Sequence, residues 1–143
     1  MSDFAGLDLY TNDGRGHFTD VTQKWVAEPH AFGMAHALAD FNADGKVDFL
    51  VIGMNSPTAD RLNHLGLTRA GAEQDSAARR SMSFGNRLYL AGEGKPVFRQ
   101  TSLNDSIARS GWSWGAGAFD LDNDGFTDVY IANGHQTNRS ARE

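Results

Sequence analysis

The stretch DFNADGKVDFLVIG, Asp40 to Gly53, places an oxygen-rich loop directly before an apolar segment of strand length, and DLDNDGFTDVYIANG, Asp120 to Gly134, repeats this arrangement 80 residues later. Oxygen-bearing side chains occupy positions one, three, five and nine of each loop: Asp40, Asn42, Asp44 and Asp48, then Asp120, Asp122, Asp124 and Asp128. Calcium takes 6 to 8 oxygen ligands, and alternate residues of a tight loop can direct them to one point. We therefore predict two Ca²⁺ sites, to which the backbone carbonyls of Lys46 and Phe126 add one ligand each.

An EF-hand is the obvious alternative for such loops, because its loop begins in the same way and also has glycine at position six. It requires a glutamate at position twelve and a helix on each side. Position twelve is Val51 in the first loop and Ile131 in the second, and each lies in an apolar run typical of a covered strand. The sequence therefore predicts loops that lead into a sheet.

A second alternative is that these residues only form turns, since Asn, Asp and Gly dominate hairpin turns. One loop alone would not separate the two interpretations. Two loops with the same oxygen spacing and the same apolar continuation favour a metal, and calcium suits them better than magnesium, which prefers small octahedral sites.

A hairpin-like pattern recurs as well, in LYTNDGRGHFTDVT from Leu9 to Thr22 and LYLAGEGKPVFRQTS from Leu88 to Ser102. Short apolar runs separated by turn residues predict strands. We predict two repeat units, at about 1–55 and 85–134. The segment between them, about 56–84, is richer in Ala, Arg and Leu and is predicted to be a partly helical inserted loop.

Repeated four-stranded units must stack on neighbours to bury their faces, and radial stacking gives a β-propeller of typically 4 to 8 blades. The predicted fold is therefore all-β, a fragment of a β-propeller with about two four-stranded blades, occupying 1–143. We expect either a longer parent chain that supplies the remaining blades or self-association through open sheet edges.

Composition excludes several classes of protein. The two loops hold seven of the 18 acidic residues, and the 11 elsewhere face 13 Lys and Arg, so the acidity is local and no basic surface for nucleic acid is expected. No apolar stretch is long enough to span a membrane. The chain has no cysteine, so its stability must come from packing or bound ions.

The remaining candidates carry no catalytic prediction. No histidine has a zinc-ligand partner at useful spacing, and the loop aspartates have no evident partner for acid–base chemistry. Trp112 and Trp114 alternate at the start of a predicted strand, where we expect them to fill space between blades.

The segments from Phe32-Gly33 to Gly53 and from Trp114-Gly115 to Gly134 resemble FG-GAP, or VCBS, repeats of integrin α-chain propellers, and LYTNDGRGHFTDVT resembles the subset found with ASPIC/UnbV domains and in cartilage acidic proteins. The resemblance implies a seven-bladed propeller whose loops bind calcium for structure. It departs in Asn42, which replaces an Asp, in the absence of an ASPIC/UnbV domain and in the blade count.

These observations predict a noncatalytic calcium-binding module that recognises a protein or a glycan within a larger exported or cell-surface protein. The alternatives are a scaffold part of a larger enzyme, which needs convergent titratable groups outside the loops, and a repeat-mediated assembly module, which needs concentration-dependent association.

Overall fold

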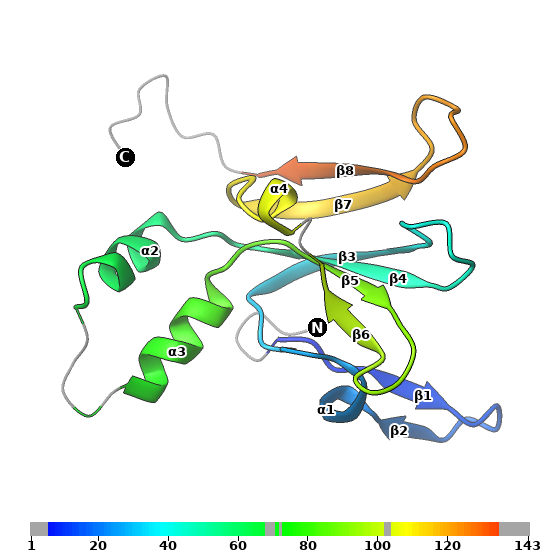
Figure 1. Ribbon diagram of the computed structural model, residues 1–143, viewed down its shortest axis with the longest axis horizontal. Coiled ribbons are helices and arrows are strands. Elements are labelled where there is room, and N and C mark those ends of the chain that lie inside the picture. Colours follow the sequence, from blue (N-terminus) through cyan, green and yellow to red (C-terminus); the bar gives the residue numbers. More distant parts are fainter. Residues whose placement is uncertain (1–5, 68–70, 72, 102–103, 135–143) are drawn as a thin grey trace.

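The computed structural model describes residues 6–67, 71, 73–101 and 104–134, in which eight strands form three antiparallel sheets (Figure 1). The first sheet pairs β1 (Tyr10–Asn12) with β2 (Phe18–Asp20). The central sheet has the order β3 (Gly33–Ala39), β4 (Asp48–Gly53), β5 (Arg87–Ala91) and β6 (Phe98–Gln100). The third pairs β7 (Ser113–Phe119) with β8 (Asp128–Asn133).

Four helices connect these strands: α1 (Thr22–Trp25), α2 (Pro57–His64), α3 (Glu73–Met82) and α4 (Asn104–Ile107). Ser56 begins α2 by accepting a hydrogen bond from the Ala59 amide at 3.3 Å, next to a proline at the first helical position. The two longer helices lie in the predicted insertion, and Arg79 ties them together by donating to Asn63. The predicted all-β fold with a partly helical insertion is confirmed.

The sequence repeat and the sheets are out of phase. The central sheet takes β3 and β4 from the first predicted unit and β5 and β6 from the second, so the insertion interrupts one sheet between its second and third strands. The repeat predicts the period of the structure, but hydrogen bonds between distant strands set where each sheet begins. How the predicted units divide the chain into domains stays a prediction, and residues 1–5, 68–70, 72, 102–103 and 135–143 lie outside the described residues.

Two hydrophobic cores cover the two faces of the central sheet, because successive residues of a strand point to opposite faces. Every residue of β4 is buried, as the continuous apolar run predicted. The first core joins Phe49, Val51 and Tyr89 to Leu7, Val26 and Ala31. The second joins Ala37, Leu50, Ile52 and Leu88 to Ala116, Ala118, Val129 and Ile131 of the third sheet.

Tyr89 lies in the first core, stacked on Phe49 with ring centroids 4.7 Å apart, and its hydroxyl donates to the Glu28 carbonyl at 2.8 Å. Burial raises the pKa of Tyr89 to about 12, from 10.0. We expect a variant with Tyr10→Phe and Tyr130→Phe, which keeps Tyr89 as its sole tyrosine, to ionise with a midpoint near pH 12 in an ultraviolet titration.

Because the folded pKa of Tyr89 lies above the unfolded value, its contribution to stability is complete below pH 10 and is lost as the pH rises towards 12. Circular dichroism recorded along the same titration reports whether the fold is still present. Ionisation at pH 10 in the folded protein would contradict the burial of this ring.

Candidate metal centre

The two Asp-rich loops join equivalent strand pairs and lie at the same end of the molecule, whereas α2 and α3 lie at the other end (Figure 1). The first loop connects β3 to β4, and the second connects β7 to β8. Each turns through two left-handed residues, Ala43 (φ 57°) and Gly45 (φ 81°) in the first and Asn123 (φ 59°) and Gly125 (φ 89°) in the second. The positive φ favours glycine at position six, as its position predicted.

Backbone amides hold the side-chain oxygens of the first loop inward. The Asp44 amide donates to Asp40 Oδ1 at 3.0 Å and to Asn42 Oδ1 at 3.2 Å, so one N–H draws these two oxygens together. The Gly45 amide donates to Asp40 Oδ2 at 2.7 Å, and the Lys46 amide donates to Asp44 Oδ1 at 3.0 Å. Amides inside the loop therefore fix the orientation of all three side chains.

The second loop repeats the same bonds. The Asp124 amide donates to Asp120 Oδ1 at 3.1 Å and to Asp122 Oδ1 at 3.2 Å, the Gly125 amide to Asp120 Oδ2 at 3.0 Å, and the Phe126 amide to Asp124 Oδ1 at 2.9 Å. Two loops 80 residues apart thus adopt one geometry, because their local hydrogen-bonding groups have the same spacing.

Three carboxylates converge in the second loop. Asp120, Asp122 and Asp124 each offer an oxygen within 4.8 Å of the others, and all three residues are exposed. Like charges this close repel one another unless a cation compensates them. The first loop has the same arrangement with the neutral amide of Asn42 in place of one carboxylate.

The carboxylates at position nine have a different setting from the other three. Asp48 has no exposed surface, and its Oδ2 accepts from the Phe41 amide at 3.0 Å and its Oδ1 from the Ala91 amide at 2.7 Å. Asp128 accepts from the Leu121 amide at 2.9 Å and is not part of the converging group. Asp48 therefore closes its loop through the Phe41 amide and links β4 to β5 through the Ala91 amide. The spacing of residues within the loop could not predict this second role.

Lys46 distinguishes the two loops further. Its Nζ lies 3.6 Å from Asp44 Oδ2, whereas the equivalent residue in the second loop is the uncharged Phe126. The Lys46 amide, with smaller contributions from Asn42 and the Lys46 ammonium, lowers the pKa of Asp44 below its usual value, so Asp44 is ionised at neutral pH. A cation entering the first loop would have to displace this ammonium group.

The donor set fits a hard divalent cation. It consists of oxygens, it carries three or four formal negative charges per loop, and solvent reaches the loops. The strands β4 and β8 follow the loops directly, so the EF-hand alternative is wrong. Turn formation explains the amide bonds, and the same bonds bring the carboxylate oxygens of the second loop near one point, so the turn interpretation and the metal interpretation both fit this geometry.

An aromatic pocket lies at the opposite ends of β3 and β7. Phe32, Met34, Met54, Trp112 and Trp114 line a cavity of about 330 Å³. Trp112 is 46% exposed and Trp114 is 52% exposed, and the expectation that they fill space between blades stays a prediction. Trp112 precedes and Trp114 lies within a β-bulge between Ser113 and Gly115, which the alternation of aromatic residues could not indicate.

Comparison with known proteins finds similarity in the segment that contains the first loop. Residues 2–51 match the sequence model of the FG-GAP-like repeat. This segment is similar to an FG-GAP-like repeat. A 50-residue segment is 46% identical to "Cartilage acidic protein 1" of Mus musculus and, equally, of Homo sapiens, covering 34% of this chain and 8% of each relative. The predicted resemblance to FG-GAP repeats and cartilage acidic proteins is confirmed, and no solved structure matches the chain.

The matched segment at 2–51 includes β1, β2, α1, β3, the first loop and the start of β4, so the similarity crosses from the first sheet to the central one. FG-GAP-like repeats form propellers, and the antiparallel sheets of the described residues are consistent with a propeller fragment. The second loop lies outside the matched residues. Its link to FG-GAP-like repeats is its similarity in sequence to the first loop of this chain. In the described part of the chain, no helix has the length and apolar character needed to cross a bilayer.

Proposed function

We propose that this chain is a noncatalytic binding module whose FG-GAP-like loops each hold one calcium ion. The observation that carries the proposal is the convergence of inward-turned oxygens in two loops of identical hydrogen-bonding geometry. The ligands would be Asp40, Asn42, Asp44, Asp48 and the Lys46 carbonyl in the first loop, and Asp120, Asp122, Asp124, Asp128 and the Phe126 carbonyl in the second.

The bound ions would neutralise the clustered carboxylates and tie the two strands of each hairpin together. Because the folded loop binds calcium and the unfolded chain does not present it, binding adds to the free energy of unfolding. Weak sites of this kind stay filled where calcium is abundant, since extracellular modules bind with dissociation constants of about 10⁻⁴–10⁻³ M. The proposal therefore includes an exported or cell-surface location.

The partner would be a protein or a glycan. The aromatic pocket offers a surface for such a partner, because exposed tryptophan rings contribute large contact areas at low conformational cost. This surface lies away from the loops, so calcium would support the fold without touching the partner.

A calcium titration by isothermal calorimetry tests the metal sites. We expect two ions per chain, with the second loop binding more tightly, because it has four carboxylates to the three of the first and lacks the Lys46 ammonium. Asn42→Asp should tighten the first site and Asp122→Asn should weaken the second, each by roughly tenfold, since one charge beside a divalent ion contributes about 1–2 kcal/mol near a surface.

Asp13→Asn is the matched control. Asp13 is an exposed aspartate that accepts from the Arg15 amide in the β1–β2 turn, so it shares the turn chemistry but not the converging cluster. It should leave both affinities unchanged. Absence of calcium binding, or equal losses with Asp13→Asn and Asp122→Asn, would contradict the assignment of the loops.

A further inference from the structure

In the described residues only β4 and β5 are paired on both sides, and among the strands paired on one side are their counterparts in the repeat, β8 and β1. The strand β1 pairs with β2, and β8 pairs with β7, whereas their counterparts in the central sheet pair with each other. Residues of β4 correspond to residues of β8 at an offset of 80, and residues of β5 correspond to residues of β1 at an offset of 79. The pairing of β4 with β5 therefore shows how the free edge of β8 could pair with the free edge of a β1 strand.

We infer that β8 of one copy pairs with the β1 segment of a second copy in the antiparallel register seen between β4 and β5. That register joins Phe49 to Tyr89, Leu50 to Leu88 and Val51 to Arg87. Transferred through the repeat, it joins Val129 to Tyr10, Tyr130 to Leu9 and Ile131 to Asp8. The product is a four-stranded sheet with the order β7, β8, β1, β2, built from two copies, and it requires no bound ion.

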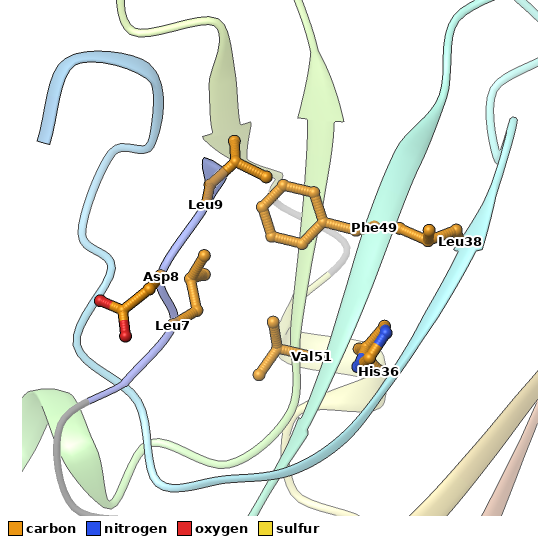
Figure 2. Close-up of a pocket in the computed structure, with 7 residues that line it drawn as sticks. All are labelled: Leu7, Asp8, Leu9, His36, Leu38, Phe49 and Val51. Atoms are coloured by element: carbon orange, nitrogen blue, oxygen red, sulfur yellow. The ribbon is translucent and has the colours of Figure 1, made fainter. Parts of the chain in front are cut away.

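A cavity on the central sheet fits this arrangement. It measures about 210 Å³ and lies between Leu7, Asp8 and Leu9 on one side and Phe49 and Val51 on the other (Figure 2). His36 and Leu38 of β3 also line it. Because apolar surface of this kind gains from removal of water, the cavity is a surface for a further apolar element.

The packing of the third sheet identifies that element. One face of the third sheet packs against the residues Ala37, Leu50 and Ile52 of the central sheet. The packing residues of the third sheet are Ala116, Ala118, Val129 and Ile131. In the repeat they correspond to His36, Leu38, Phe49 and Val51. The residues of β7 and β8 that correspond to Ala37, Leu50 and Ile52 are Gly117, Tyr130 and Ala132. The register above places Tyr130 of one copy over the cavity of the next, so the interface between copies continues the interface within one copy.

Exposure of equivalent residues supports the same junction. Leu50 and Tyr89 have no exposed surface, but their counterparts Tyr130 and Tyr10 are 58% and 53% exposed. Phe98 packs edge-on against Phe49 with centroids 4.8 Å apart, while its counterpart Phe18 is 65% exposed. Three aromatic rings thus lie at the surface where the repeat places core residues.

The position-nine carboxylate adds a polar contact. Asp48 Oδ1 accepts from the Ala91 amide across the β4–β5 junction, and the counterpart of Ala91 is Asn12. In the junction between copies, Asp128 would accept from the Asn12 amide of the second copy, in addition to its own Leu121 amide.

The contact is heterologous, so copies joined in this way form a ring where the rotation closes and a filament where it does not. Each copy contributes two blades, one complete and one shared. A propeller of typically 4 to 8 blades would then contain two to four copies.

Sedimentation velocity over a wide concentration range tests the inference. We expect reversible association to two to four copies, and we expect Tyr130→Glu to raise the dissociation constant about tenfold or more, because it places a charge in the apolar contact. Leu65→Glu is the matched control, since Leu65 is 55% exposed at the end of α2, outside the junction. Circular dichroism checks that both variants remain folded.

Disulfide trapping tests the register directly, since the chain has no cysteine of its own. Mixed Leu9→Cys and Tyr130→Cys variants should cross-link into a heterodimer on mild oxidation, because directly opposed residues lie within reach of a disulfide. Asn12→Cys mixed with Tyr130→Cys, three residues out of register, should not. A monomer at every concentration, association unaffected by Tyr130→Glu, equal cross-linking by both pairs, or capture of another repeat-bearing chain by a monomer would each overturn the inference.

Discussion

Removal of calcium by a chelator is expected to lower the melting temperature by roughly 10–20 °C. Each site filled at about one hundred times its dissociation constant contributes about 2.7 kcal/mol to the free energy of unfolding, and two sites contribute about twice that. Differential scanning calorimetry with saturating calcium, with chelator and after calcium is restored measures the effect. Magnesium should restore less of it, because the loops offer flexible oxygen ligands that suit the larger ion.

The double variant Asp44→Ala and Asp124→Ala separates bound calcium from general effects of salt. It removes one converging carboxylate from each loop, and both residues lie at or near the surface. Its melting temperature should be low and should not respond to calcium. An unchanged melt of the original chain in chelator would rule out calcium as a stabilising ligand.

Replacement of Asp48 with alanine is expected to lower the free energy of unfolding by about 3 kcal/mol, even in chelator. The Asp48 carboxylate is fully buried and accepts from the amides of Phe41 and Ala91. Hydrogen bonds to a charged group contribute about 1.5–3 kcal/mol, and two buried donors would lose their partner. Urea denaturation of the variant in chelator, and again with calcium, measures the loss.

Asp128→Ala is the control for this prediction, because Asp128 is only partly buried and accepts one such bond, from the Leu121 amide. In the monomer it should lose about half as much stability. A cost for Asp48→Ala that appears only when calcium is present would show that Asp48 acts as a metal ligand and not as a fastening between strands.

The difference in calcium affinity between the two loops depends on one set of residues, and the association of copies depends on another. The charge difference lies in Asn42 and Lys46 of the first loop, whereas the junction between copies depends on Tyr130 and the cavity beside Phe49. Variants in one set should leave the other property unchanged, so the two proposals can fail separately.

The sequence by itself determined the local chemistry of the protein. The oxygen spacing of each loop, the left-handed turn at Gly45 and Gly125 and the strand after each loop all agree with the structure. They could be predicted because the groups involved lie within a few residues of one another, so covalent geometry and local hydrogen bonds leave few arrangements open. The repeat likewise predicted the all-β architecture and the helical insertion.

Only the tertiary structure decided how distant segments meet. It placed β4 beside β5, across the boundary of the repeat, and it turned Asp48 towards the amide of Ala91, 43 residues away. It also placed the partly exposed Trp112 and Trp114 beside Phe32, Met34 and Met54, around one pocket. These outcomes depend on which strands share hydrogen bonds and which faces come into contact, and the pattern of a single segment contains no information about its partner.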